Sequence, residues 1–124
     1  DMACYKARAE AVRHAEVYRG AFAISVCPSE NVESPTIVGA QAANELLNII
    51  GIKASFVLTE YNGKIYISSR SIDEINVQLI MERLGGGGYL NVAGAQLKDC
   101  TIVQAKHAIM DTLDEMLKEG DIQE

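Results

Sequence analysis

Residues 54–69, ASFVLTEYNGKIYISS, are the stretch that decides the fold. Two runs rich in β-branched, aromatic and other apolar residues, 54–61 and 64–69, flank the pair Asn62-Gly63. An Asn-Gly pair favours the two-residue type I′ turn, because both of its residues readily adopt positive φ. The sequence therefore predicts an antiparallel β-hairpin in the middle of the chain.

Helical and extended patterns also precede the hairpin. Apolar residues recur at helical spacing over residues 2–18, and a short apolar run at 21–26 is typical of a buried strand. Ser34 and Pro35 together predict the start of a helix, with the Ser34 hydroxyl as its cap. That helix is expected to run through residue 50 and to end at a glycine.

The same alternation continues after the hairpin. Asn76 is placed to cap a helix that ends at a run of glycines, and Thr101 with Gln104 matches the capping box of a last helix. The elements expected here are a helix at 77–84, a strand at 96–100 and a helix at 102–117.

Interleaved helices and strands with a single tight hairpin predict an α/β fold, in which helices cover a mixed sheet. A length of 124 residues is that of one domain, residues 1–124. The net charge of −6 argues against broad nucleic-acid binding, which draws its affinity from clustered lysine and arginine. No apolar stretch approaches the roughly 20 residues that span a bilayer.

Four consecutive glycines, Gly85, Gly86, Gly87 and Gly88, stand out between two predicted elements. Ordering glycine costs more conformational entropy than ordering any other residue, so such a run needs a reason. One reason is a ligand that the backbone approaches closely, with successive N–H groups facing a phosphate or a carboxylate. The other is a flexible turn that stops a helix, and the residues alone leave both open.

Three further residues near the glycines are candidates for ligand binding. Arg70 follows the second hairpin strand and could bind phosphate through two parallel hydrogen bonds, or form a surface ion pair. Tyr89 could stack on a nucleobase, and Asn91 could hydrogen-bond a base or a phosphate, although both could equally be structural.

The residue pattern offers no catalytic group and no metal site. His14 and His107 are isolated, and the three cysteines lack CxxC spacing, which argues against zinc and against a disulfide framework. From the residues alone, the inference stops at an anion-binding α/β domain.

The segment ISSRSIDEINVQLIMERLGGGGYLNVAGAQL, residues 67–97, resembles the C-terminal DHH-associated domain of DHH phosphoesterases. That domain couples an arginine after a strand to a GGGH-type loop. The resemblance extends over nearly the whole chain and is strongest to cyclic-di-AMP phosphodiesterases of the GdpP (YybT) type.

The resemblance implies a substrate-binding domain for cyclic-di-AMP or a linear adenine dinucleotide. Arg70 and Gly85 to Gly88 would hold the phosphate or the adjoining nucleotide, with Tyr89 and Asn91 close by. Catalysis is expected from an upstream DHH domain of the same polypeptide that binds two manganese ions, so this fragment should be inactive alone. It holds no cofactor by this expectation.

One residue departs from the family pattern, because Tyr89 stands where the family usually has histidine. A histidine can carry positive charge near neutral pH, whereas tyrosine offers a neutral donor and an aromatic face. The alternatives are therefore a domain of an oligoribonuclease or adenosine-bisphosphate phosphatase, and a non-enzymatic nucleotide-binding module. The resemblance further implies membrane helices upstream, a position on the cytoplasmic face, and leaves room for a homodimer.

Overall fold

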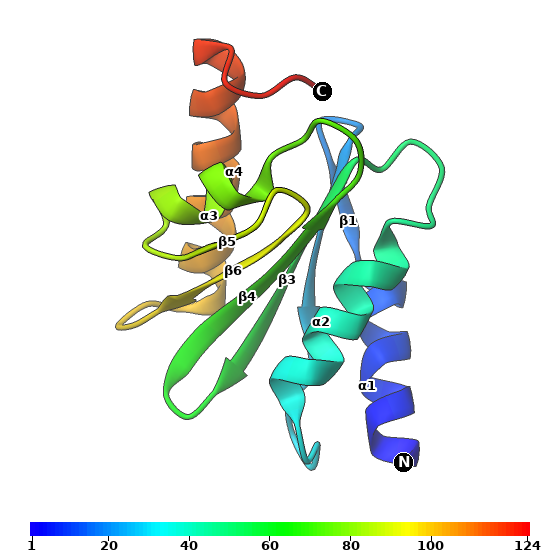
Figure 1. Ribbon diagram of the computed structural model, residues 1–124. Coiled ribbons are helices and arrows are strands. Elements are labelled where there is room, and N and C mark those ends of the chain that lie inside the picture. Colours follow the sequence, from blue (N-terminus) through cyan, green and yellow to red (C-terminus); the bar gives the residue numbers. More distant parts are fainter.

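The computed structural model describes residues 1–124, which form one six-stranded sheet and four helices. The helices are α1 (Met2–Arg13), α2 (Pro35–Leu46), α3 (Val77–Arg83) and α4 (Ile102–Glu119). The strands are β1 (Glu16–Tyr18), β2 (Phe22–Cys27), β3 (Ala54–Tyr61), β4 (Lys64–Ser71), β5 (Gly87–Gly88) and β6 (Val92–Leu97). Their order is β1-β2-β3-β4-β6-β5, with only β2 and β3 parallel (Figure 1). The predicted α/β class with a mixed sheet is confirmed.

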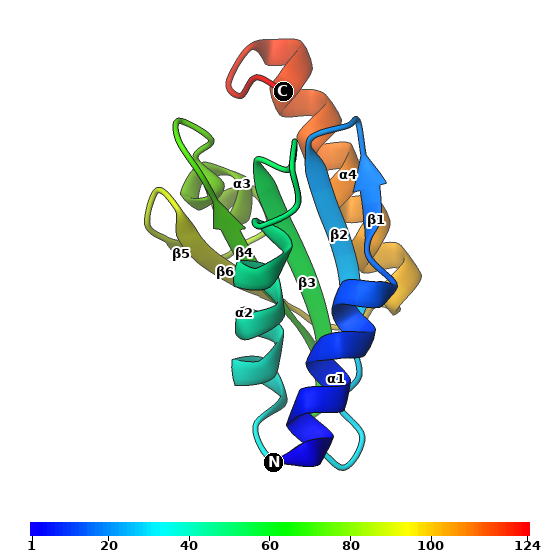
Figure 2. The ribbon, with the colours of Figure 1, turned by 90° about the vertical axis from the view of Figure 1, so that its right-hand side faces the viewer.

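The helices form a layer on each face of the sheet (Figures 1 and 2). Alternate residues of β2 show the division, since Phe22 and Ile24 pack with α3 and α4 while Ala23 packs with α1 and α2. The rings of Phe22 and Phe56, both fully buried, lie 6.4 Å apart between centroids on the α3 and α4 side. Two separate cores therefore stabilise the sheet, one on each face.

The predicted hairpin is confirmed as β3 and β4. Tyr61 pairs with Lys64, and Asn62 and Gly63 take φ of 52° and 73° in the turn between them. Both values lie in the left-handed region that a type I′ turn requires. The longest antiparallel ladder of the sheet thus follows from a local sequence signal.

Two of the three predicted helix caps are confirmed. The Asn76 side chain accepts a hydrogen bond from the Leu79 N–H at 3.2 Å. Thr101 and Gln104 form the reciprocal capping box at 3.1 and 2.9 Å. The prediction for Ser34 is wrong, because its side chain makes no capping hydrogen bond and only the proline after it marks the start of α2.

Both N-terminal helices are shorter than predicted. α1 ends at Arg13, and residues 16–18 instead pair with β2 as an edge strand. In this strand the Tyr18 hydroxyl donates to the Asp114 carboxylate of α4 at 2.7 Å. α2 ends at Leu46, and the chain then tightens into turns in which the Asn48 N–H bonds to the carbonyl three residues earlier.

The strand predicted at 96–100 is misplaced, because β6 occupies Val92–Leu97. Ala93, Gly94 and Ala95 have low strand propensity, but pairing with β4 overrides it. A Cβ on Gly94 would lie 2.8 Å from the Ile67 carbonyl oxygen, so the small residue fits this close pairing. No helix of the protein has both the length and the apolar character needed to cross a membrane.

Candidate ligand-binding face

Part of the sheet beside α2 carries no helix, and the predicted site residues gather around it. On β4, Ile65, Ile67 and Ser69 are buried toward α3 and α4, whereas the alternating residues between them are half-buried on the opposite side. Directly paired residues share a face, so the register gives the members of this surface. This open face consists of Tyr66, Ser68 and Arg70 on β4, Val92, Gly94 and Gln96 on β6, and Gly87 on β5.

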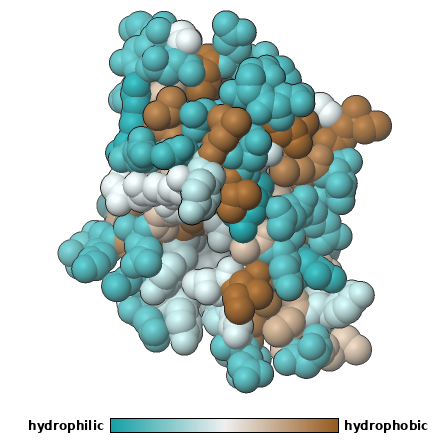
Figure 3. Space-filling model, in the orientation of Figure 1, coloured by the Kyte–Doolittle hydropathy of each residue, from teal (hydrophilic) through white to brown (hydrophobic).

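The open face has a hydropathy close to neutral. Figure 3 shows pale surface where β5, β6 and β4 run, hollowed beside α2 and bordered by more apolar patches. Hydroxyl, amide and glycine groups make up most of it, and it contains no carboxylate. Such a surface suits a polar or anionic ligand.

Arg70 is the arginine without a carboxylate partner. Its Nη1 donates to the Ser69 carbonyl oxygen at 2.9 Å, and no acidic oxygen lies within 4.0 Å. Burial lowers the pKa of Arg70, since the guanidinium is partly removed from water. The other arginines, Arg8, Arg13, Arg19 and Arg83, each form an ion pair with Asp or Glu. A partly desolvated cation with no counter-charge favours the binding of an anion.

The first two glycines of the run end helix α3. The Gly85 N–H donates to the Glu82 carbonyl at 3.1 Å and the Gly86 N–H to the Met81 carbonyl at 2.8 Å. With φ of 84° at Gly85, this is the Schellman pattern that closes many helices. These two N–H groups are therefore occupied within the protein and do not form an anion-binding nest.

Close packing accounts for two of the four glycines. A Cβ on Gly86 would lie 2.1 Å from the Gly94 carbonyl oxygen, and one on Gly88 would lie 2.6 Å from the Val92 carbonyl oxygen. At Gly87 a Cβ would meet no atom within 4 Å, and the φ there is one that other residues adopt. Neither conformation nor packing requires glycine at residue 87, which opens onto the same face as Arg70.

Tyr89 lies at the same level of the sheet as Arg70. Its N–H donates to the Val92 carbonyl at 2.7 Å, and Val92 is the direct partner of Arg70 on β4. Tyr89 is 78% exposed. Leu90 and Val92 are also exposed, and with Tyr89 they form an apolar rim around the β5–β6 turn.

Asn91 turns away from this rim. Its Nδ2 donates to Ser71 Oγ at 2.8 Å, to the Asp73 carbonyl at 3.3 Å and to the Ile75 carbonyl at 3.5 Å. The side chain thus ties the β5–β6 turn to the segment between β4 and α3. The register thus places Arg70 and Gly87 on one face of the sheet, Tyr89 lies in the turn at its edge, and the Asn91 amide has its partners within the protein.

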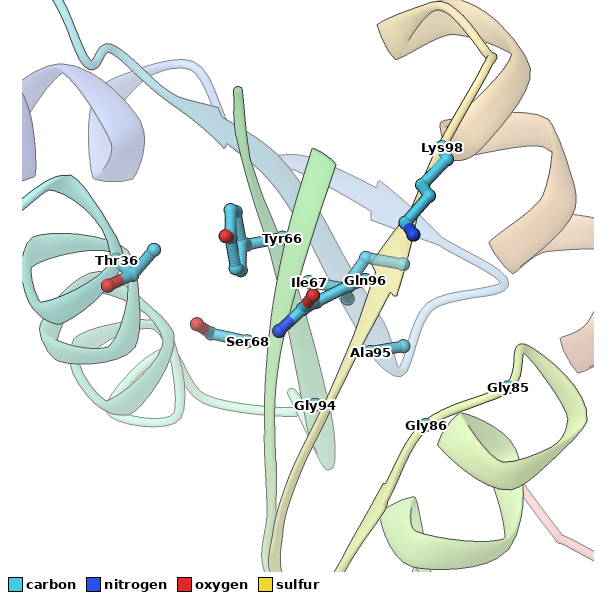
Figure 4. Close-up of a pocket in the computed structure, with 10 residues that line it drawn as sticks. All are labelled: Thr36, Tyr66, Ile67, Ser68, Gly85, Gly86, Gly94, Ala95, Gln96 and Lys98. Carbon is cyan, nitrogen blue, oxygen red and sulfur yellow. The ribbon is translucent and has the colours of Figure 1, made fainter. Parts of the chain in front are cut away.

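A cavity of about 460 Å³ lies on the lower part of the open face, between α2 and β6. Tyr66 and Ser68 point from β4 toward Thr36 on α2, and the Gln96 side chain extends from β6 toward β4 (Figure 4). Lys98 lines the cavity at the end of β6, and Gly85 and Gly86 border its far side.

Sequence reasoning missed Thr36, Tyr66, Gln96 and Lys98 as site residues. The alternation Tyr66, Ser68, Arg70 on a confirmed strand is a signal that could have found Tyr66. Gln96 lies within the strand predicted at 96–100 and Lys98 follows the observed β6, but the sequence did not reveal the pairing that sets Gln96 beside Tyr66. Thr36 carries no local signal, since only the packing of α2 brings it to the sheet.

The chain contains no cluster of typical metal ligands. No three His, Cys, Asp or Glu side chains lie close enough together to hold a metal ion. The residues that line the cavity include no histidine and no carboxylate that could act as a general acid or base. The hydroxyl, amide and amino groups of this face can bind and orient a ligand.

Comparison with known proteins gives the family context. Residues 21–119 match the model of the DHHA1 domain. The chain is 42% identical over 115 residues to the cyclic-di-AMP phosphodiesterase PdeA of Listeria monocytogenes, covering 92% of this chain and 17% of that protein. It is 37% identical over 120 residues to the cyclic-di-AMP phosphodiesterase GdpP of Geobacillus thermodenitrificans, covering 96% of this chain and 18% of that protein.

A solved structure shares the fold at low sequence identity. An exopolyphosphatase-related protein from Bacteroides fragilis superposes with a TM-score of 0.81 at 20% identity, over 94% of this chain and 35% of that one. The chain spans less than a fifth of the length of the two phosphodiesterases. These similarities confirm the resemblance drawn from residues 67–97.

Proposed function

Because this chain belongs to the DHHA1 domain family, we propose that it is the substrate-binding domain of a DHH-family phosphodiesterase. Its substrate in this proposal is cyclic-di-AMP or a linear adenine dinucleotide. We take residues 1–124 to be one such domain, a fragment that works with a DHH domain upstream in the same polypeptide. The two phosphodiesterases are more than five times as long as this chain, which leaves room in such a protein for a separate catalytic domain.

The observation that carries the proposal is the unpaired Arg70 on an open face without carboxylates. A guanidinium can hold two phosphate oxygens through parallel charge-assisted hydrogen bonds. The net charge of −6 would repel a dinucleotide elsewhere, which makes a local cation on a neutral surface the favourable docking point.

The other predicted site residues, Gly87, Tyr89 and Asn91, each have a distinct role in this binding. Gly87 lets the ligand approach the backbone of the edge strand, because no side chain stands there. The exposed Tyr89 ring supplies an aromatic surface on which a base can stack. Asn91 acts mainly by holding the β5–β6 turn in place, through its hydrogen bonds to Ser71, Asp73 and Ile75.

The chemistry is assigned to the upstream DHH domain. Two manganese ions there would activate a water and stabilise the charge that develops on the phosphodiester. No three metal-ligating side chains of this chain lie close together, and in this proposal its own residues bind and orient the substrate. We therefore expect no turnover from residues 1–124 alone.

Tyr89 favours a second candidate function. Without the histidine usual in the family at this position, the domain could serve another substrate, such as a short oligoribonucleotide or adenosine bisphosphate. A third alternative is a nucleotide-binding module that is not part of an enzyme. We also propose, from the family resemblance alone, that the whole protein is anchored to the membrane with this domain on the cytoplasmic face, and that it can form a homodimer.

A domain exchange tests the leading proposal. The aligned 115 residues of the Listeria monocytogenes phosphodiesterase would be replaced by this chain, and hydrolysis of cyclic-di-AMP measured with manganese. We expect the hybrid to hydrolyse cyclic-di-AMP and the isolated chain to be inactive. Arg70→Ala in the hybrid should raise KM more than it lowers kcat. A folded hybrid without activity, or rapid turnover by the isolated chain, would contradict the proposal.

A further inference from the structure

We propose that the cavity between α2 and β6 is a second subsite, which binds the adenine base of the second nucleoside while Arg70 holds a phosphate. This inference rests on the proposed function, because it requires a dinucleotide as the ligand. It adds Thr36, Tyr66, Ser68, Gln96 and Lys98 to the residues that contact substrate.

The polar groups of the cavity are all free to bind a ligand. The side chains of Thr36, Tyr66, Ser68, Gln96 and Lys98 make no hydrogen bond or ion pair within the protein, although they come from α2, β4, β6 and the residue that follows β6. Elsewhere on the same face of the sheet the hydroxyl of Ser55 is bonded to the backbone of α2. The lining of the cavity is therefore polar, convergent and unsatisfied by the protein itself.

The groups present suit an adenine ring. The Gln96 amide offers one donor and one acceptor, the arrangement that pairs with the N7 acceptor and N6 donor of adenine. Tyr66 supplies an aromatic ring, whose centroid lies 6.3 Å from that of the Tyr61 ring. Gly94, which pairs with Ser68 next to the Tyr66–Gln96 pair, leaves the floor beside Gln96 free of a side chain. Lys98 adds the positive charge that an adjoining phosphate requires.

The spacing of the two subsites points to a ligand with two nucleosides. Tyr66 and Arg70 are four residues apart on β4 and face the same side, which separates them by about 13 Å along the strand. A phosphate at Arg70 and a base beside Gln96 would thus lie at opposite ends of the open face. A dinucleotide bridges this separation lengthwise, while pyrophosphate fills the Arg70 end only.

The test is an NMR titration of the labelled chain with two probes, inorganic pyrophosphate and the linear dinucleotide pApA. Pyrophosphate should shift the amide signals of Arg70 and Gly87 alone. The dinucleotide should shift these signals and also those of Gln96 and Lys98. Dinucleotide shifts confined to Arg70 and Gly87 would overturn the second subsite and leave the proposed function intact. If neither probe moves Arg70 or Gly87, the proposed function fails together with this inference.

Variants separate the two subsites by affinity. Gln96→Ala should weaken pApA binding at least about tenfold, the factor that corresponds to 1.4 kcal/mol, and leave pyrophosphate binding within about twofold. Lys98→Ala should weaken pApA binding more than the matched control Lys118→Ala, which changes an exposed lysine of α4. Unchanged pApA affinity in a folded Gln96→Ala variant would contradict the assignment. The spectrum of each variant reports whether it is folded.

Discussion

Gly87 lies directly opposite Gly94 in the ladder between β5 and β6, and a Cβ added to Gly87 would meet no atom within 4 Å. The glycines on either side of Gly87 differ from it. Gly86 and Gly88 pack too closely against β6 to carry a side chain. Within one short run, glycine thus serves packing at two residues and leaves the surface open at a third.

We therefore expect an alanine substitution to lower stability at Gly86 and to weaken ligand binding at Gly87. Gly86→Ala should lower the free energy of unfolding by about 1–3 kcal/mol, because the new methyl group overlaps the Gly94 carbonyl. Gly87→Ala should leave stability within about 1 kcal/mol of wild type and weaken dinucleotide binding. Urea denaturation and a ligand titration measure the two effects. Equal stability losses at both residues would show that the run acts only as a structural element.

We expect the Asn91 side chain to contribute mainly to the stability of the protein and less to ligand binding. Asn91→Ala removes the donor to Ser71 Oγ at 2.8 Å and to two backbone carbonyls. The loss should be about 1–3 kcal/mol, because part-buried acceptors are left without a partner. Urea denaturation of Asn91→Ala beside Asn48→Ala, which changes an exposed residue of the turn after α2, measures it. An unaffected Asn91→Ala with weakened ligand binding would assign Asn91 to the substrate.

Local signals account for the parts of the fold that the sequence predicted correctly. The Asn62-Gly63 turn, the Asn76 cap and the Thr101 capping box each depend on residues within a few positions of one another. The edge strand β1 and the strand β6 depend on partners far along the chain, and their own residues resemble a helix end and a spacer. Their boundaries were therefore wrong or missed.

The candidate site divides in the same way. Arg70 and the glycine run were predicted as site residues because a strand end and a run of glycines are visible in the sequence. Thr36 and Gln96 were missed because they belong to elements that only tertiary packing brings together. For the glycine run, the sequence left open a ligand-binding loop and a turn that stops a helix. Gly85 and Gly86 have the second role, because their N–H groups close α3.

We expect the Cys27 thiol to be unreactive in the folded protein. We also expect it to make the free energy of unfolding depend on pH in the alkaline range. Burial raises the pKa of Cys27 to about 11 from its ordinary value of 9.0, so the unfolded chain loses this proton first. The free energy of unfolding should therefore fall as pH rises from about 9 to about 11, and less so in Cys27→Ala. Urea midpoints at pH 8.5 and 10.5 for both proteins measure the difference. The same change of urea midpoint between these two pH values in wild type and in Cys27→Ala would contradict this prediction.

Thiol labelling gives an independent check on Cys27. Cys4 and Cys100 are partly exposed and should react with a thiol reagent in the folded protein, whereas Cys27 is 1% exposed and should react only on unfolding. Mass spectrometry of the labelled peptides distinguishes them. Early labelling of Cys27 would show that its surroundings open readily.

Tyr89 is predicted to act through its ring. Tyr89→Phe should keep dinucleotide affinity within about twofold, because the aromatic face remains, while Tyr89→Ala should lose about 1–3 kcal/mol of stacking. Tyr89→His should tighten binding as pH falls through about 6.5, since the imidazole then gains a positive charge near phosphate. Calorimetric titrations at pH 5.5 and 7.5 compare these variants. A marked loss in Tyr89→Phe would mean that the hydroxyl contacts the ligand instead.

The most direct test of the central claim is the affinity of the chain for the linear adenine dinucleotide, measured by calorimetry for wild type, Arg70→Ala and Arg13→Ala. Arg13 is an exposed arginine of α1 that already pairs with Glu10, so it serves as the matched control. We predict that Arg70→Ala weakens binding about 10- to 100-fold, as expected for the loss of charged hydrogen bonds, and that Arg13→Ala changes it less than twofold. Equal affinity of a folded Arg70→Ala and the wild type would contradict the account.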